Sequence, residues 1–492
     1  FLSFLTKGMS CMTIIFHCVV SVLSLGIVVA LLFIFVCRYY FNRLRKSHKR
    51  QSKKTIAFFH PYCSSGGGGE RVLWKSIQAL DELNCLGSYC EIIIYTVDPP
   101  DKNYAIQLFK HIQSRFTIPP PTSLKISFVH LSSYSHFLQK ANRFSLIAEA
   151  WGTAMFAFMA LNESLPDVFF DTTGCAFTYF VARILAGCEV VAYVHYPTIS
   201  TDMLQLVWDR RPTYNNDTKV VNSTFSTYVK LLYYAIFASA YAVAGSMCSL
   251  VMVNSSWTRS HISSLWRVPR QRLHTLFPPC DTDTLKDLSL DRRVPIIVSI
   301  GQFRPEKDHM LQIKSLEILI RNFPKWKDAK LVMIGSCRGP EDEQRVTELQ
   351  NFISSLGLHD SVEFVLNQPY SVVKEWLTKA SIGLHTMWNE HFGIGVVEMM
   401  AAGLLVIAHN SGGPKQDILV PFKGKQIGYL AKSDTEFAFA MNEALSLSPS
   451  ESRMMRASAR QASMTFSDQA FMTSFKKIIT ESSILMASNP DI

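Results

Sequence analysis

Short runs of apolar, β-rich residues recur along most of this chain, and stretches of helical pattern or loop separate them. The runs in the first half are Lys54–His60, Glu91–Val97, Leu124–His130, Pro166–Asp171, Glu189–His195 and Leu250–Asn254. Those in the second half are Pro295–Ile300, Lys330–Gly335, Ser361–Leu366, Ser381–His385 and Leu404–Ala408. This alternation predicts an α/β fold with doubly wound parallel sheets, whose ligands bind at the carboxyl ends of the strands.

A polar, charged stretch at Asp281–Arg293 separates the two sets of runs and predicts a connection between two domains. The chain has 492 residues, 48% of them hydrophobic, which is enough for two or three domains with cores of their own. We predict an N-terminal end and membrane anchor (1–37), a basic linker (38–54), a first Rossmann-like domain (55–285), a second Rossmann-like domain (286–460), and a C-terminal helical segment (461–492) that packs back on the first domain.

The anchor is predicted from Cys11–Cys37, a run without charged residues that is rich in Val, Leu, Ile and Phe. It is long enough to span a bilayer and too long for the apolar part of a signal peptide. A basic cluster between Arg38 and Lys54 follows it, so the positive-inside rule places everything after Arg38 in the cytosol. The alternative is a buried core helix.

The net charge of +10 comes mainly from that cluster, which argues against a nucleic-acid-binding protein. The 11 cysteines form no Cys-x-x-Cys pair, so reduced cytosolic thiols are expected rather than disulfides or a zinc site. A second run without charges, Leu231–Val253, is not expected to cross the membrane, because a crossing would separate the two domains. We predict an apolar helix over Leu231–Ala244, either in the core or in the membrane interface.

In the first half, the run Lys54–His60 leads into the glycines Gly66–Gly69 and then into a helical pattern from Val72 to Leu83. A strand, a Gly-rich loop and a helix in this order can present backbone N–H groups to an anionic or polyhydroxyl ligand. Glu70 stands where a phosphate-binding P-loop has lysine, and a flexible linker is the alternative. His195 ends a later run and either faces the ligand or has a structural role.

In the second half, Arg304 and Lys307 follow the run Pro295–Ile300 and precede a helix. Two cations at a strand's carboxyl end suit a diphosphate, although an ordinary surface turn has the same residues. Glu390 and Glu398 flank a Phe-Gly-Ile-Gly turn and the start of a further helix, whose free N–H groups suit hydroxyls or phosphates. Two solvated carboxylates are the alternative. Gly412–Gly413 is predicted as another loop approaching the same crevice.

Together these features are similar to the retaining glycosyltransferases of family 4, which have the GT-B fold of two Rossmann-like domains facing a cleft. The similarity covers roughly residues 55–480. The N-terminal anchor and two sequence runs, His-Pro-Tyr-Cys-Ser-Ser-Gly-Gly-Gly-Gly-Glu-Arg and Asn-Glu-His-Phe-Gly-Ile-Gly-Val-Val-Glu, resemble one branch of that family. This branch contains the eukaryotic GDP-mannose-dependent α-1,2-mannosyltransferases of the dolichol-linked oligosaccharide pathway of asparagine-linked glycosylation.

The resemblance implies transfer of the fourth and fifth mannoses, with retention, from GDP-mannose to a dolichyl-diphosphate oligosaccharide. It implies a single-pass protein of the endoplasmic reticulum membrane whose catalytic body is cytosolic. Other mannosyltransferases of the pathway are further expected partners, and nucleic acid is not. No metal ion or other cofactor is expected. A membrane-tethered, inactive scaffold and a transferase for another donor, such as UDP-GlcNAc, remain alternatives.

The resemblance also implies a role for each motif. Arg304 and Lys307 would neutralise the departing GDP, and Glu398 would bind the ribose. Attack would occur from the front face, with the leaving phosphate taking the acceptor proton, and the Gly-rich loop would close over the diphosphate and the acceptor. The predicted catalytic residues are Glu390, His195, Arg304 and Lys307. The predicted substrate-binding residues are Gly66, Gly67, Gly68, Gly69, Arg304, Lys307, Glu390, His391, Phe392, Gly393, Ile394, Glu398, Gly412 and Gly413.

Overall fold

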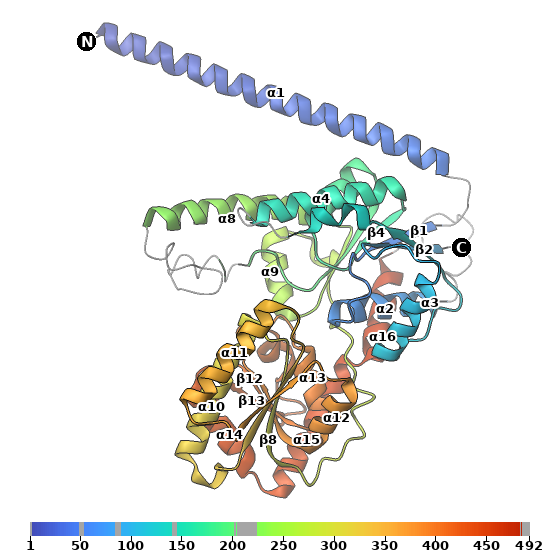
Figure 1. The fold of residues 1–492 in the computed structure, drawn as a ribbon. Coiled ribbons are helices and arrows are strands. Elements are labelled where there is room, and N and C mark those ends of the chain that lie inside the picture. Colours follow the sequence, from blue (N-terminus) through green and yellow to red (C-terminus); the bar gives the residue numbers. More distant parts are fainter. Residues whose placement is uncertain are drawn as a thin grey trace.

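The computed structural model describes residues 2–48, 54–83, 90–139, 145–200, 203, 224–482 and 484. It contains two α/β domains, each built around one parallel sheet, with a long N-terminal helix extending away from the first domain (Figure 1). The predicted fold class is confirmed.

The sheet of the first domain has the strand order β3-β2-β1-β4-β5-β6-β7, and neighbouring strands are parallel. Apolar side chains dominate these strands because helices cover both faces. The strand β7 was not predicted, since three residues are too few to show a pattern. The bounds are β1 Lys54–Phe59, β2 Cys90–Thr96, β3 Lys125–His130, β4 Val168–Asp171, β5 Glu189–Val194, β6 Leu250–Val253 and β7 Leu273–Thr275.

Two core clusters lie on opposite faces of this sheet. One face carries α2 (Gly68–Asp81), α3 (Tyr104–Phe116) and the C-terminal α16 (Asp468–Glu481), which lies beside α2 in Figure 1. The other face carries η1 (Ser132–Leu138), α4 (Ser145–Glu163), α5 (Phe177–Phe180), η2 (Val181–Leu185), α8 (Thr224–Gly245) and α9 (Ser256–Trp266). The short turn η3 (Arg270–Arg272) directly precedes β7.

The sheet of the second domain has the order β10-β9-β8-β11-β12-β13, again all parallel. Its strands are β8 Val294–Ile300, β9 Lys330–Gly335, β10 Val362–Leu366, β11 Ala380–His385, β12 Leu405–His409 and β13 Tyr429–Ala431. Its helices are η4 (Pro305–Lys307), α10 (His309–Asn322), η5 (Pro324–Trp326), α11 (Pro340–Ser355), α12 (Tyr370–Lys379), α13 (Ile394–Ala401), η6 (Pro414–Ile418), α14 (Asp434–Ser446), α15 (Pro449–Ser463) and η7 (Met464–Phe466).

The chain crosses between the domains twice, and the two crossings are paired. The backbone N–H of Cys280 donates to the carbonyl of Phe466 at 3.0 Å, just before the chain enters α16. On α16, the Asp468 carboxylate forms ion pairs with Arg71 and Lys75 of α2, with nitrogen–oxygen distances of 2.8 and 3.0 Å. The last helix of the chain is therefore fixed to the first domain by apolar contacts and by charge.

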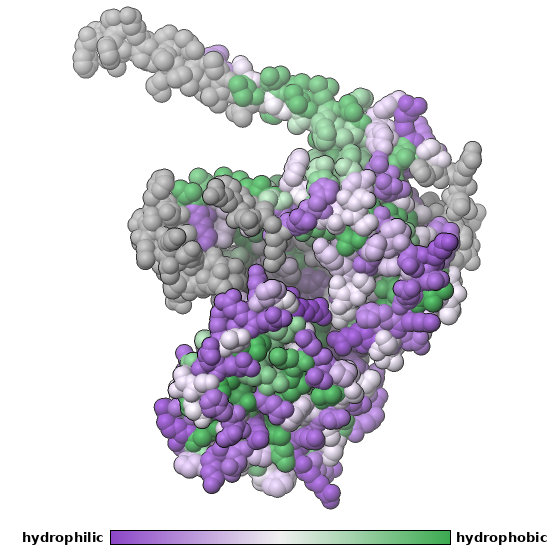
Figure 2. Space-filling model, viewed as in Figure 1, coloured by the Kyte–Doolittle hydropathy of each residue, from purple (hydrophilic) through white to green (hydrophobic). Residues whose placement is uncertain are grey.

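The N-terminal segment differs from the prediction in one respect. The predicted linker begins at Arg38, but α1 (Leu2–His48) continues as a helix through most of it. By length and composition alone, α1 over Val20–Ser47 and α8 over Tyr228–Gly245 are apolar enough to cross a membrane. Figure 2 shows hydrophobic residues along the described part of α1 and along α8. Because β6 follows α8 directly within the sheet, α8 remains part of the first domain.

Candidate functional site

The predicted site residues of the two halves meet where β5 and β11 end. Tyr196, just after β5, stacks on His391 with ring centroids 5.2 Å apart, and Trp257 of α9 approaches the same imidazole at 5.2 Å. A Cβ placed on Gly68 would lie 2.7 Å from the Ile394 side chain. These contacts bring the Gly-rich loop, the segment after β5 and the loop Asn389–Gly393, called here the Glu390 loop, to one junction.

Glu390 lies at the centre of a group of three charged or titratable side chains. One carboxylate oxygen, Oε2, receives the Lys307 ammonium at 2.7 Å and the His385 Nε2–H at 3.0 Å. The other, Oε1, accepts the backbone N–H of His391 at 3.1 Å. Burial opposes ionisation of Glu390, but Lys307 and His385 outweigh it and hold the pKa of this carboxyl well below its ordinary value. Glu390 is therefore a fixed, weakly basic carboxylate.

Lys307 ends η4, the short turn that follows β8. Pro305 has the fixed φ that suits the start of this turn, and Asp308 caps the next helix by accepting the N–H of Leu311. The Thr386 hydroxyl donates to the Lys307 carbonyl at 2.7 Å, which ties η4 to the end of β11. Arg304, three residues earlier, is exposed, and we find no hydrogen bond or ion pair of its guanidinium to the described residues. One cation is thus paired within the site and the other is available to a ligand.

The Glu390 loop is held from behind by the segment after β12. The Ser411 hydroxyl accepts the Asn389 N–H at 2.8 Å, and the Gly413 N–H donates to the Glu390 carbonyl at 2.7 Å. A Cβ on Gly412 would lie 2.2 Å from that carbonyl, and one on Gly413 would lie 2.5 Å from Phe392. These two glycines were predicted to approach a ligand. The structure gives them a different contact, the backbone of the Glu390 loop, and substrate binding by them stays a prediction.

The helix α13 begins directly after the Glu390 loop. Gly393 precedes it with φ 112°, a conformation that favours glycine, and no side chain of the described residues caps the helix start. The N–H groups of Ile394 and Gly395 are thus left for a ligand. The Phe392 ring is buried against Phe277 and Phe466, so only the backbone of this residue can contact a substrate.

Glu398 lies on α13, facing the first domain. Burial raises the pKa of its carboxyl to about 7, while Arg71 of α2 opposes this shift and Asp281 adds to it. The Glu398 carboxyl therefore titrates near neutral pH, whereas Glu390 stays ionised there.

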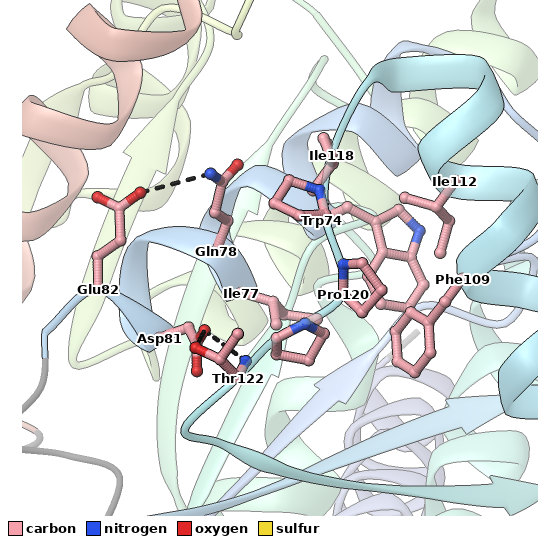
Figure 3. A pocket seen from close by; sticks show the side chains of 12 residues that line it. Trp74, Ile77, Gln78, Asp81, Glu82, Phe109, Ile112, Ile118, Pro120 and Thr122 are labelled. Atoms are coloured by element: carbon pink, nitrogen blue, oxygen red, sulfur yellow. Dashed lines mark hydrogen bonds between the residues drawn. The ribbon is translucent and has the colours of Figure 1, made fainter.

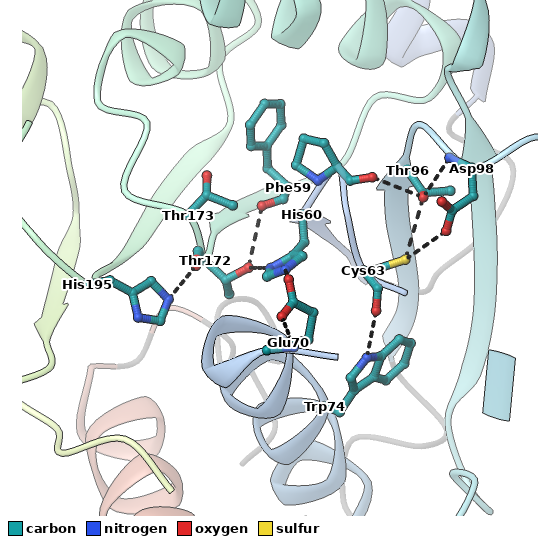
Figure 4. A network of polar contacts seen from close by, with 12 residues as sticks. Phe59, His60, Cys63, Glu70, Trp74, Thr96, Asp98, Thr172, Thr173 and His195 are labelled. Atoms are coloured by element: carbon teal, nitrogen blue, oxygen red, sulfur yellow. Dashed lines mark hydrogen bonds and ion pairs between the residues drawn. The ribbon is translucent and has the colours of Figure 1, made fainter. Parts of the chain in front are cut away.

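The Gly-rich loop is organised by a polar network that the sequence did not reveal (Figure 4). The helix α2 begins at Gly68, four residues earlier than predicted, because the Glu70 carboxylate accepts the Gly67 N–H at 2.6 Å. The same carboxylate contacts His60 Nε2 at 3.3 Å, and His60 Nδ1 lies 2.7 Å from the Thr172 hydroxyl. Burial opposes ionisation of Glu70, but the contacts with His60 and the backbone lower its pKa.

His195 follows β5 and joins the same network. Its Nε2–H donates to the carbonyl of Thr172 at 3.0 Å, because a carbonyl oxygen can only accept. Burial, with His60 nearby, lowers the pKa of His195 to about 4, so the ring is neutral at physiological pH. Nδ1 then carries a lone pair that can accept a hydrogen bond from a hydroxyl. Gly69 lies beside this ring, with an ideal Cβ 3.6 Å from Nε2.

Comparisons with known proteins show the family of this chain. Residues 53–266 match the family described as ALG11 mannosyltransferase N-terminus, and residues 282–462 match glycosyl transferases group 1. A Xenopus tropicalis protein named GDP-Man:Man(3)GlcNAc(2)-PP-Dol alpha-1,2-mannosyltransferase is 41% identical over 93% of this chain and 94% of its own length. The proteins of the same name from Mus musculus and Dictyostelium discoideum are 42% and 37% identical, over 91% and 88% of this chain and 92% and 86% of their own lengths. The chain belongs to this mannosyltransferase family.

Solved glycosyltransferases share the fold of this mannosyltransferase. One from Rickettsia africae has a TM-score of 0.57 at 17% identity and covers 89% of this chain and 100% of its own. HepE of Anabaena, solved in complex with UDP-glucose, has a TM-score of 0.58 at 14% identity and covers 87% of this chain and 99% of its own. At such identities the likeness shows the fold alone, and it confirms the predicted GT-B arrangement.

Several side chains of this mannosyltransferase site were missed by sequence reasoning. His60 and His385 end the runs that became β1 and β11, so the strand-end rule could have identified them. Tyr196 also follows a strand end, but Trp257 lies in α9, and the contact of both with His391 depends on how the two domains meet.

A cavity of about 200 Å³ lies elsewhere in the mannosyltransferase, between α2, α3 and the Pro-rich segment before β3 (Figure 3). Its polar groups pair with one another: Gln78 donates to Glu82, and Asp81 accepts the Thr122 N–H. Within the described ranges, no three His, Cys, Asp or Glu side chains are grouped to hold a metal ion. Metal independence stays a prediction.

Proposed function

We propose that this chain transfers mannose from GDP-mannose to Man(3)GlcNAc(2)-PP-Dol, forming α-1,2 linkages with retention of configuration. It would add the fourth and fifth mannoses of the N-glycan precursor at the cytosolic face of the endoplasmic reticulum. The observation that carries the proposal is the group of Lys307, His385 and Glu390 beside the open start of α13, in a member of this family. An inactive scaffold would not need an ion pair ordered in this way.

The leaving diphosphate of GDP would be bound by the second domain. Arg304 is exposed, and Lys307 can turn from Glu390 towards a phosphate with little movement of the backbone, because Thr386 fixes η4. The N–H groups at the start of α13 would add a partial positive charge. These groups supply the electrostatic stabilisation that a metal ion supplies in other transferases, so we propose that the reaction needs no metal.

The mannose would lie between the Glu390 loop and His195. Glu390 Oε1 and His195 Nδ1 can both accept hydrogen bonds from sugar hydroxyls. Each is a weak base, since the pKa of Glu390 lies well below its ordinary value and that of His195 is about 4. Neither group therefore suits the role of general base. This supports front-face attack in which the departing phosphate takes the acceptor proton. Glu398 would bind the ribose hydroxyls.

The deciding experiment is transfer to a synthetic phytanyl-diphosphate oligosaccharide carrying three mannoses, with the purified full chain. We expect products heavier by one and two hexoses with GDP-mannose, sensitive to an α-1,2-mannosidase, and none with UDP-GlcNAc. Transfer from UDP-GlcNAc alone would support the second donor class. Absence of transfer from any nucleotide sugar would support the scaffold and contradict our proposal.

The membrane part of the proposal rests on α1 and α8. The exposed face of α8 carries Tyr228, Val229, Leu232, Ile236 and Val243, which suits the bilayer interface. Topology is tested with the native sequons Asn162-Glu-Ser and Asn254-Ser-Ser and with a sequon engineered into 281–293. We expect no shift on glycosidase treatment of the membrane-expressed protein. Glycosylation of Asn162 would show that the anchor has the opposite orientation. Glycosylation of the engineered site alone would mean that α8 crosses the bilayer.

A further inference from the structure

The C-terminal part of α1 packs into the first domain instead of leaving the membrane as a free tether. Cys37 and Phe41 are 7% and 0% exposed, although the α1 residues just before them are exposed. Phe41 meets Phe158 of α4 edge to face, with ring centroids 5.4 Å apart. Both buried side chains belong to the same core cluster as the inner residues of β1, β4 and β5. A helix of the anchor thus contributes to the core of the domain.

Polar contacts fix the rotation of α1 on this surface. Arg38 Nη1 donates to the carbonyls of Arg183 and Ile184, both at 3.1 Å, at the end of η2. The guanidinium lies against Gly187, where an ideal Cβ would be 3.0 Å from Nη1. The Tyr40 hydroxyl donates to the Asn162 side chain at the end of α4. The first basic residue after the apolar run is therefore engaged by protein carbonyls.

A second arginine extends the contact to the start of β4. Arg45 Nη1 pairs with Asp167 at 3.0 Å, and its Nη2 donates to the carbonyls of Pro166 and Ala186 at 3.3 and 3.2 Å. Asp167 in turn accepts the N–H of Thr55 in β1 at 2.9 Å. Side chains on successive turns of α1, from Cys37 to Arg45, thus contact α4, η2 and the segment before β4, and Asp167 links that segment to β1.

We infer that residues 37–45 of α1 are a docking segment that holds the first domain, and with it the transfer site, at a fixed height and orientation relative to the bilayer. This inference rests on the proposed function, because the acceptor is lipid-linked. The apolar run ends at Cys37, where docking begins, so no free chain lies between membrane and domain.

The consequence for the site follows from β4. This strand joins the docked end, at Asp167, to Thr172, whose carbonyl holds His195. Five residues of extended strand place the two ends about 16 Å apart. A flexible linker over 38–54 would instead allow an r.m.s. excursion of about 23 Å, larger than that distance. A docked helix holds the site within a narrow range of heights, which suits the two acceptors that differ by one mannose, whereas a flexible tether would reach acceptors of many lengths.

Two flexible ten-residue Gly/Ser insertions in the full-length protein separate these cases. One lies between Val36 and Cys37 and frees the docked domain from the membrane helix. The matched control lies between Gln51 and Ser52, after the docking segment and before β1, so the contacts of residues 37–45 are retained. Each is assayed with GDP-mannose on the dolichyl-linked acceptor in liposomes and on a short-chain acceptor in solution.

We expect the insertion before Cys37 to lower turnover of the liposome acceptor at least tenfold, with turnover of the soluble acceptor within twofold of wild type. The control should stay within twofold on both acceptors. Equal activity of the two variants on liposomes would overturn the inference, and so would an equal loss on both acceptors by the first variant. If wild type transfers no mannose to either acceptor, the proposed function fails, and docking is decided by hydrogen exchange.

Hydrogen exchange measures docking without activity. In the variant with the insertion before Cys37, the segment that contacts the domain is a helix of only about a dozen residues. A helix of this length has marginal stability in water on its own. Slow exchange of its amides would support docking. Exchange at the rate of a free peptide would contradict it, whatever the transferase assay shows.

Discussion

Replacing Lys307 with alanine should affect both turnover and folding stability, and the two effects can be separated. In the folded protein the Lys307 ammonium lies 2.7 Å from Glu390, and the two side chains are 23% and 13% exposed. The substitution removes a charge predicted to stabilise the departing diphosphate. It also leaves Glu390, a largely buried carboxylate, with only His385 as a side-chain partner among the described residues.

The expected magnitudes follow from these two losses. Losing one preorganised charge contact to a developing anion costs about 3 kcal/mol of transition-state stabilisation, or roughly a hundredfold in turnover. Removing one partner of a largely buried pair costs about 3 kcal/mol of folding stability, which lowers the Tm of a domain of this size by roughly 6–12 °C.

The loss of stability should depend on pH in a defined direction. The folded pKa of Glu390 is depressed, so its contribution is complete above the unfolded pKa of about 4.3 and is lost as pH falls through the folded pKa. Wild type and Lys307→Ala should therefore differ most between pH 5 and 8, and should converge in more acidic solution.

The assay is turnover of GDP-mannose at pH 7.5 together with thermal unfolding at pH 7.5 and in a series of buffers from about pH 4.3 downwards, and Arg304→Ala is the matched control. Arg304 is exposed, so this variant should lose comparable turnover with a Tm within about 1 °C of wild type. Unchanged unfolding of Lys307→Ala would refute the role of the ion pair. Normal turnover of Arg304→Ala and Lys307→Ala would remove both cations from the site.

Three further predictions concern the surroundings of this pair. His385→Leu should lower kcat/KM for GDP-mannose roughly tenfold or more, because it removes the hydrogen bond to Glu390. His385→Gln, which keeps a donor, should retain most of the wild-type kcat/KM. Equal losses in the two variants would argue against a role of His385 in positioning Glu390. Gly413→Ala should lower the free energy of unfolding, measured with denaturant, by about 1–3 kcal/mol, because its Cβ would lie 2.5 Å from the Phe392 backbone. The control Gly424→Ala has open space for its Cβ but a φ of 74°, and should lower it by about 1 kcal/mol. Turnover should persist in EDTA, whereas loss that manganese or magnesium reverses would contradict metal independence.

The fold could be predicted because both sheets are covered on each face, so most strands are continuous apolar runs. The strands β7 and β13, of three residues each, are too short for such a signal. The start of α2 was missed because Gly68 and Gly69 are poor helix formers, and the Glu70 contact that compensates for them is tertiary as well as local. The docked part of α1 was read as a linker because a basic cluster has the same composition whether its arginines face lipid or protein carbonyls.

The sequence identified many residues of the candidate site, but not the residues that they contact. Charge and position at strand ends identified Lys307 and Glu390, yet nothing in their spacing indicates that they pair with each other in the folded chain. The glycines Gly412 and Gly413 were assigned by composition to ligand approach, and the close partner they have is the Glu390 loop. A pair of glycines indicates that the backbone packs closely against another group, but only the fold shows whether that group is a ligand or another loop.

The two helix starts that face the junction differ in charge, and this difference predicts which domain binds which part of the substrate. At α2, the Glu70 carboxylate accepts the Gly67 N–H and remains ionised, so its negative charge offsets the partial positive charge of the helix start. At α13, no side chain of the described residues caps the start, and Lys307 lies within one side chain's reach. An anion is therefore favoured at α13 and disfavoured at α2. We therefore propose that the Gly-rich loop, with His60 and Glu70 behind it, binds sugar hydroxyls and that the second domain binds the diphosphate.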